Sequence, residues 1–161
     1  MNKLTDLEKC YIAGFLDGDG CVNAQIVRRK DYILKFQIRV SVTFFQHTKR
    51  RWFLIYLKKK LKLGTLRDRS DGISELAIVG AQSVYNFLVA FKPYICIKRR
   101  QTRLALLIIN KLSQSKRDPV AFLKLCEIAD KFEYLNDSKK REITSAVVRS
   151  ELGLGNTVKS P

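Results

Sequence analysis

The sequence predicts an α+β fold with the element order α-β-β-α-β-β-α and extra helices at the C-terminal end. A helix-start signal opens the chain at Thr5, and residues 34–45 alternate between apolar and polar side chains, as in a strand with one buried face. Asp71-Gly72 lies between two short β-prone runs and is a common hairpin turn. The chain has 161 residues, 46% of them hydrophobic, and no linker divides it. We therefore expect one domain over residues 1–152 and a flexible tail over residues 153–161.

The first helix is expected over residues 6–17, ending near Gly18. Thr5 and Glu8 form a capping-box pattern at its start. Gly14 and Gly18 are four residues apart and share one helical face. Each glycine costs roughly 1 kcal/mol against alanine in a helix interior. We therefore expect another backbone to pack very close to this face.

Two carboxylates, Asp17 and Asp19, follow where the helix dipole disfavours negative charge. Local rules that fail together are expected at functional sites. Taken alone, Asp19 is better interpreted as a polar loop residue, but the two glycines and the net charge favour a functional role. We interpret the segment as a close-packed helix pair that delivers carboxylates to a cation. Asp17 is expected only to cap the chain or to pair with a nearby cation.

Alternation defines the faces of the next two strands. In residues 21–27, one side carries Val22, Ala24 and Ile26, and the other carries Asn23, Gln25 and Val27. In the second strand the apolar face consists of Leu34, Phe36, Ile38, Val40, Val42 and Phe44, and the polar face of Lys35, Gln37, Arg39, Ser41 and Thr43. Both strands are therefore expected to bury one face and leave a polar one open.

The remaining elements follow from caps, breakers and apolar spacing. We expect a helix capped by Thr48 and ended by Gly64, strands near residues 65–69 and 73–79, and helices over residues 81–91, 98–112, 119–135 and 144–152. In the second helix the inward residues are expected to be Trp52, Ile55, Tyr56 and Leu63; in the fourth they are Leu104, Leu107, Ile108 and Leu112.

Lysine and arginine number 31 against 15 acidic residues, which gives a net charge of +16. This excess predicts a polyanionic partner, and nucleic acid is favoured over a membrane because no basic amphipathic anchor is evident. The apolar runs are too short to span a bilayer, and no signal peptide or other targeting peptide is visible at the N-terminus. The alternative is a basic protein without a specific enzymatic function, such as a ribosomal component.

Four scattered cysteines argue against a zinc site, since none forms a Cys-x-x-Cys pair and His47 is the single histidine. We expect free, mostly buried thiols in a reducing compartment. His47 itself is interpreted as a surface residue.

Residues 12–20 read Ile-Ala-Gly-Phe-Leu-Asp-Gly-Asp-Gly and resemble the nine-residue motif of the LAGLIDADG homing endonucleases. The motif is matched outright at Ala13, Gly14, Asp17, Asp19 and Gly20. Further likeness lies at Gln46, residues 49–53, Lys98, Gln101 and residues 135–139. From about residue 11 to residue 149 the chain is similar to the compact, single-motif, homodimeric members of algal chloroplast group I introns.

This resemblance implies a saddle-shaped antiparallel sheet backed by helices, and an enzyme that cuts a long, near-palindromic double-stranded DNA site as a homodimer. It implies metal-dependent phosphodiester hydrolysis with Mg²⁺, for which Mn²⁺ or Ca²⁺ can substitute. By the family pattern, Asp19 binds the metal and Gly18 contributes its carbonyl. Gln46 would orient water, and Arg50 and Lys98 would stabilise charge on the phosphate.

The polar strand face is expected to read base edges in the major groove, because asparagine, glutamine and arginine pair with bases there. The expected DNA-binding residues are Asn23, Gln25, Arg29, Tyr32, Gln37, Arg39, Arg67, Arg69 and Glu75, with Ser138 and Lys139. The basic runs at residues 98–100 and 138–141 are expected to position the DNA backbone. Gly14 and Gly18 are expected at the dimer interface.

Two other functions remain open from the sequence. An intron RNA maturase of the same fold would bind nucleic acid without nuclease activity, but Asp19, Gln46 and Lys98 argue against it. A basic ribosomal or repressor-like protein leaves the glycine-carboxylate helix unexplained. Neither a membrane nor a small-molecule substrate is expected as a partner. The resemblance places the protein in an organelle, the chloroplast first and the mitochondrion as the alternative, and an engineered relative is also compatible.

Overall fold

The computed structural model describes residues 4–136 and 141–155. Its elements are α1 (Asp6–Asp19), β1 (Gly20–Arg28), β2 (Phe36–His47), a 3₁₀ turn (Thr48–Arg50), α2 (Arg51–Leu61), β3 (Thr65–Asp68), β4 (Ile73–Val79), α3 (Ala81–Phe91), α4 (Arg99–Ser115), α5 (Pro119–Leu135) and α6 (Ser145–Glu151). The predicted α-β-β-α-β-β-α order with C-terminal helices is therefore confirmed. The predicted tail falls mostly on residues 156–161, which lie outside the described residues.

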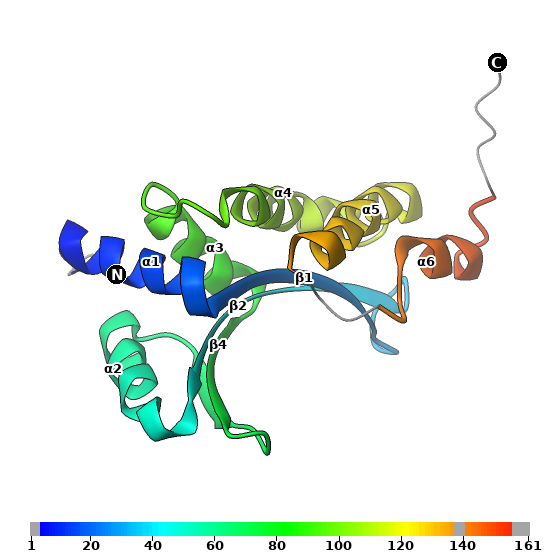
Figure 1. The fold of residues 1–161 in the computed structure, drawn as a ribbon. Coiled ribbons are helices and arrows are strands. Elements are labelled where there is room, and N and C mark those ends of the chain that lie inside the picture. Colours follow the sequence, from blue (N-terminus) through cyan, green and yellow to red (C-terminus); the bar gives the residue numbers. More distant parts are fainter. Residues whose placement is uncertain (1–3, 137–140, 156–161) are drawn as a thin grey trace.

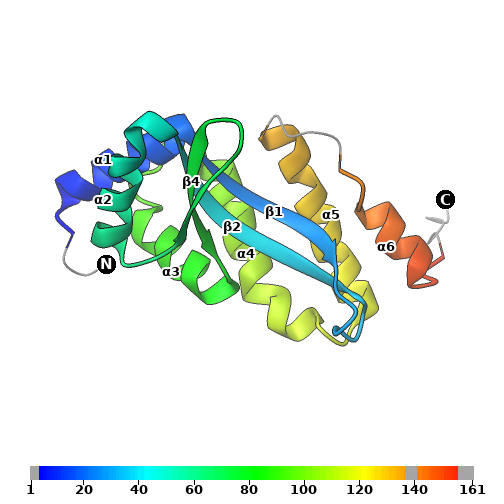
Figure 2. The same ribbon diagram turned by 90° about the horizontal axis from the view of Figure 1, so that it is seen from below.

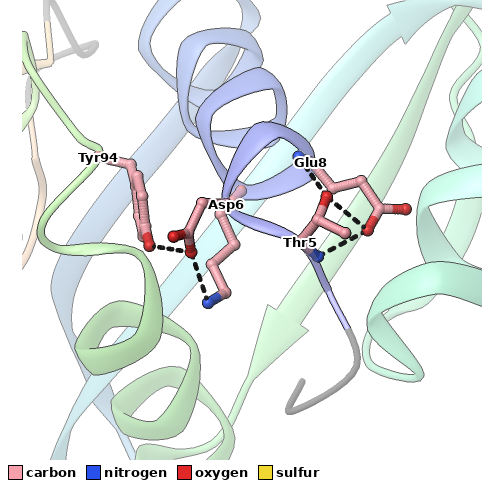
Figure 3. Close-up of polar contacts among 5 residues, drawn as sticks. Thr5, Asp6, Glu8 and Tyr94 are labelled. Carbon is pink, nitrogen blue, oxygen red and sulfur yellow. Dashed lines mark hydrogen bonds and ion pairs between the residues drawn. The ribbon is translucent and has the colours of Figure 1, made fainter.

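The start of α1 carries the predicted capping box. The Thr5 hydroxyl accepts from the Glu8 N–H at 3.2 Å, and the Glu8 carboxylate accepts from the Thr5 N–H at 2.8 Å (Figure 3). Asp6 accepts from the Tyr94 hydroxyl at 2.6 Å, which ties α1 to the segment before α4 (Figure 3). A cap of this kind contributes about 1 kcal/mol. The helix runs to Asp19 rather than ending at Asp17, so both motif aspartates are helical.

The four strands form one antiparallel sheet in the order β1-β2-β4-β3. Figure 1 shows that this sheet is curved and that α3, α4 and α5 lie on its convex side. Figure 2 looks at the opposite side, where the β1–β2 ribbon lies in front of α4 and α5. The helices thus cover the convex face of the sheet and leave the concave face of the β1–β2 ribbon uncovered.

The core lies between the convex face of the sheet and the helices. On β1 the buried residues are Val22, Ala24 and Ile26, and on and before β2 they are Leu34, Phe36, Ile38, Val40, Val42 and Phe44. Both predicted strand faces are confirmed. Leu16 of α1 and Phe87 of α3 are also fully buried, and Phe87 meets the Phe44 ring edge-on at 5.9 Å. Each such side chain stabilises the fold by about 1.5–3 kcal/mol, so α1 is held firmly against the sheet.

The predicted inward face of α2 was wrong within the helix, although Leu63, just beyond its end, packs against the core. Leu54, Leu57 and Leu61 are buried, whereas Trp52 is 66% exposed and Tyr56 is 42% exposed. The helix has two apolar stripes: the leucines face the sheet, whereas Phe53 and Tyr56 lie toward α1, where Phe53 meets the Tyr11 ring edge-on at 6.0 Å. The cap was also wrong, because the His47 side chain accepts from the Lys49 N–H and a 3₁₀ turn precedes α2.

Two further predictions need correction. Leu107 of α4 is exposed rather than inward, whereas the predicted Ile108 is buried and Leu104 and Leu112 are half-buried against the core. All four cysteines are free as expected, but Cys10 and Cys96 are exposed rather than buried. Within the described ranges, no helix is long and apolar enough to cross a membrane.

Candidate active site and nucleic-acid interface

The end of α1 and the start of β1 meet in a tight junction at Gly20. A Cβ at this position would lie 2.7 Å from the Leu16 carbonyl oxygen, closer than real Cβ atoms come. Only glycine therefore fits here. The Gly20 N–H donates to the same carbonyl and closes the helix. The junction fixes where the exposed Asp19, the last helical residue, leaves α1.

An open hollow of about 430 Å³ lies beside this junction. It is lined by Gly18, Asp19, Gly20, Phe45, Gln46, His47, Arg50 and Ile73. The structure thus brings together Asp19, Gln46 and Arg50, three of the four predicted catalytic residues. His47 also lines the hollow, but its Nδ1 caps the following turn by accepting from the Lys49 N–H at 3.2 Å. Its ring is therefore oriented by the backbone.

Gln46 and Arg50 are joined across the start of α2. The Gln46 Oε1 accepts from the Arg50 Nε at 2.9 Å and from the His47 N–H at 3.0 Å. Because the oxygen is occupied twice, the amide nitrogen is the group left to donate. Arg50 contacts a neutral oxygen, so its positive charge is not cancelled by that partner.

Asp17 organises the other side of the same helix end. Its carboxylate accepts from the N–H groups of Cys96, Ile97 and Lys98 at 2.7–3.0 Å, and the residue is 8% exposed. Burial raises the pKa of the Asp17 carboxyl, but these donors and the Lys98 charge lower it more, so its pKa lies below the ordinary value. Asp17 therefore anchors the segment that leads into α4, as expected of a capping residue.

Lys98 reaches the end of α1 from this anchored segment. Its Nζ donates to the Asp17 carbonyl oxygen at 2.6 Å. A cation is favourable here because the carbonyl end of a helix is negative. Lys98 does not line the hollow, so the structure places it against the same helix end but apart from Asp19, Gln46 and Arg50.

The residues at the hollow fit a magnesium ion that is only partly held by protein. The Asp19 carboxylate makes no hydrogen bond or ion pair with any described residue, and the described part of the chain holds no group of three or more His, Cys, Asp or Glu side chains suited to a metal. Mg²⁺ needs just one or two carboxylates when phosphate and water fill its other positions. Asp19 and the Gly18 carbonyl match that donor set, and a zinc-type cage is not present among these residues.

Six of the predicted reading residues share the open face of the sheet. They are Asn23 and Gln25 on β1, Gln37 and Arg39 on β2, Arg67 on β3 and Glu75 on β4, and the register pairs Gln25 with Arg39 and Arg67 with Glu75. They alternate with the buried residues of each strand, so they lie on the face seen in Figure 2.

Three predicted reading arginines are paired with carboxylates. Arg67 meets Glu75 at 2.6 Å, Arg69 meets Asp71 at 2.6 Å, and Arg29 binds both oxygens of Asp31 at 2.8–2.9 Å.

The Arg29 guanidinium lowers the pKa of Asp31 to about 2 and also lies over the Tyr32 ring at 5.3 Å. Arg39 makes no such pair with a described residue. Ser138 and Lys139, also predicted to contact DNA, lie outside the described residues.

Comparison with known proteins identifies the family of the chain. Residues 12–110 match the family model described as LAGLIDADG endonuclease. The chain is 46% identical to DNA endonuclease I-CvuI of Chlorella vulgaris over 153 residues, which cover 94% of each protein. It is 39% identical to DNA endonuclease I-CreI of Chlamydomonas reinhardtii, covering 88% of this chain and 86% of that one.

The chain belongs to the LAGLIDADG endonuclease family. A crystal structure of I-CvuI with its own DNA target and Ca matches this LAGLIDADG chain with a TM-score of 0.86, covering 91% of it and 93% of I-CvuI. Another holds I-CvuI on an I-CreI target with 2 mM Mg and uncleaved DNA. The archaeal I-Vdi141I, at 19% identity and a TM-score of 0.79, shares the fold. The predicted family and fold class are confirmed.

Two features of this LAGLIDADG chain escaped sequence reasoning. Cys96 and Ile97 hold Asp17 through backbone N–H groups, which leave no side-chain signal. Arg141 sits in a basic run that predicted a DNA-backbone contact, but its guanidinium donates to β1 instead. The contact could have been anticipated, because an outer strand such as β1 needs hydrogen-bond donors for its outward carbonyls.

Proposed function

We propose that this chain is a homing endonuclease that binds a long, near-palindromic duplex DNA site as a homodimer and hydrolyses both strands with Mg²⁺. The observation that carries the proposal is the free Asp19 carboxylate at the end of the motif helix, beside Gln46 and Arg50, in a chain 46% identical to a DNA endonuclease. The two algal relatives support an organellar setting, the chloroplast first.

The hollow provides the groups that phosphodiester hydrolysis needs. Asp19 and the Gly18 carbonyl would hold the metal, which supplies Lewis-acid activation of water and phosphate when bound. The Gln46 amide nitrogen is left to donate to water near the scissile phosphate. Arg50 and Lys98 each donate to a neutral oxygen and form no ion pair with a described residue, so both could stabilise a developing negative phosphate.

One face of α1 supports the homodimer. Leu7 is 83% exposed and Tyr11 is 62% exposed, and with Gly14 and Gly18 they follow helical spacing along one stripe. A Cβ at Gly14 or Gly18 would meet no atom within 4 Å, so nothing in the single chain requires glycine there. An exposed apolar stripe with small residues suits close contact with another backbone. A second copy would also bring the second Asp19 that cleavage of two strands requires.

The deciding experiment compares Asp19→Asn with the wild type on plasmid carrying the I-CreI or I-CvuI target. Magnesium is titrated upward from 2 mM, because I-CvuI left an I-CreI target uncleaved at that concentration. We expect double-strand breaks by the wild type that EDTA abolishes, and binding without cleavage by Asp19→Asn. Glu142→Gln, which neutralises an exposed acid elsewhere, should cut normally. Specific binding without cleavage by the wild type at any Mg²⁺ or Mn²⁺ concentration would favour a maturase-like binding protein.

A further inference from the structure

β1 is an outer strand of the sheet, and two side chains from beyond α5 satisfy its outward carbonyls. The Val22 carbonyl accepts from the Asn136 Nδ2 at 2.9 Å, and the Ala24 carbonyl accepts from the Arg141 Nη1 at 2.6 Å. The same Nη1 donates to the Ala129 carbonyl in α5 at 3.2 Å. Arg141 is therefore fixed between α5 and the edge of β1.

The second nitrogen of this guanidinium reaches a predicted base reader. The Arg141 Nη2 donates to the Asn23 Oδ1 at 2.8 Å, and the Asn136 Nδ2 lies 3.5 Å from the same oxygen. A guanidinium has no acceptor, so the atom of Asn23 that faces it must be the amide oxygen. Both lone pairs of this oxygen are thus faced by protein donors. The Asn23 Nδ2 donates to no described residue.

We infer that Arg141 makes Asn23 a donor-only reader of DNA bases, and this inference rests on the proposed function. A free asparagine reads adenine by accepting from N6 and donating to N7 at once. With its oxygen held, Asn23 keeps only the donor half of that pair. It then recognises an acceptor on the base edge, such as N7 or O6 of guanine, N7 of adenine or O4 of thymine, and disfavours cytosine, which offers only a donor. Arg141 is a positioning residue that acts through Asn23.

The test selects cleavable or bound duplexes from a library in which the half-sites of the I-CreI target are randomised. For the wild type we expect about a tenfold preference for an acceptor at one base position per half-site, falling to about twofold in Arg141→Met. Arg141→Lys retains a charged donor and should restore part of the preference. Arg149→Met, which removes a half-buried arginine paired with Glu127, should leave the profile unchanged.

Two more variants separate positioning from simple loss of structure. In Asn23→Asp the second carboxylate oxygen can only accept, so the preferred base at that position should change to cytosine. In the double variant Asn23→Ala/Arg141→Met, the second substitution should add nothing at that position. A uniform loss of affinity in Arg141→Met, or an unchanged profile with an unchanged melting temperature, overturns the inference. A wild type that selects no duplex at all overturns the proposed function instead.

Discussion

The cationic side chains at the end of α1 and those on the open face of the sheet have different bonding partners. At the end of α1, Arg50 donates to an amide oxygen and Lys98 to a backbone carbonyl, both neutral. On the sheet and its hairpin turns, Arg67, Arg69 and Arg29 each meet a carboxylate. These three arginines are therefore held by ion pairs, whereas Arg50 and Lys98 are held by hydrogen bonds to neutral oxygens.

The difference matches what the proposed function asks of each region. Stabilising a phosphate in the transition state needs net positive charge that is already in place, and a carboxylate partner would cancel it. Reading a base needs an arginine held in a defined orientation, and a carboxylate supplies that orientation through directional hydrogen bonds. Exposed pairs of this kind contribute at most about 1 kcal/mol. A correct base can therefore replace the carboxylate at little cost.

The largest effect is expected from removing a cation at the end of α1. Lys98→Met should lower the single-turnover cleavage rate by about 10²-fold, the usual size for one charge-stabilising group, while leaving the preferred DNA sequence unchanged. Lys111→Met, at an exposed position of α4, is the matched control and should cut normally. A change in sequence preference without a rate loss would move Lys98 from the chemical step to reading.

The uncovered face of α1 offers the next test, because under the proposed function cleavage requires a second copy of the chain and half-site reading does not. Gly14→Ala or Gly18→Ala adds a Cβ that meets nothing in the single chain, and alanine favours the helix by up to about 1 kcal/mol. In the dimer the same Cβ should separate the helices, and a shift of about 1 Å can cost roughly 10²-fold in rate.

In these variants the fraction of dimer measured by sedimentation and the cleavage rate should therefore fall together. The free energy of unfolding of the monomer should not decrease. Gly155→Ala, where a Cβ also meets nothing, is the control. A dimer of unchanged affinity in both α1 variants would remove this face from the interface.

The sequence predicted what neighbouring residues decide and missed what distant residues decide. Period-two alternation located both buried strand faces. Cap signals also located the start of the helix predicted over residues 119–135, which is α5, and there the Asp118 carboxylate accepts from two N–H groups. The partner of Asp17 could not be read, because it is a set of backbone donors about 80 residues away. The face of α2 was wrong because two apolar stripes compete, and only the packed sheet decides between them.

A third prediction concerns Asp17, which supports the catalytic end without touching it. Asp17→Asn puts an amide nitrogen among three backbone donors, so the free energy of unfolding should fall by roughly 1–3 kcal/mol. Because the folded pKa of Asp17 lies below its ordinary value of 3.8, its stabilisation is present above that pH and is lost as pH falls through the folded pKa. Urea unfolding at a series of pH values should show the wild type and Asp17→Asn converging only below pH 3.8.

The smallest effect is expected from removing an ion pair on the open face of the sheet. This test distinguishes Arg67, which has a carboxylate partner, from Arg39. Glu75→Gln removes the carboxylate that holds Arg67, whose side chain is largely exposed, so stability should change by less than about 1 kcal/mol. The freed arginine should gain affinity for any duplex, because its charge is no longer offset, and lose discrimination at its base position.

Arg39 has no carboxylate partner among the described residues, so Arg39→Ala should relax preference at one or two base pairs per half-site by roughly 1–3 kcal/mol. Binding to full sites and to unrelated duplexes across a salt series measures both variants. Glu75→Gln should raise binding to unrelated duplexes and steepen its salt dependence, whereas Arg39→Ala should act mainly on the full site. If Glu75→Gln instead leaves binding to unrelated duplexes and its salt dependence unchanged, the carboxylate does not offset the Arg67 charge toward DNA, and the contrast between the two regions does not extend to β4.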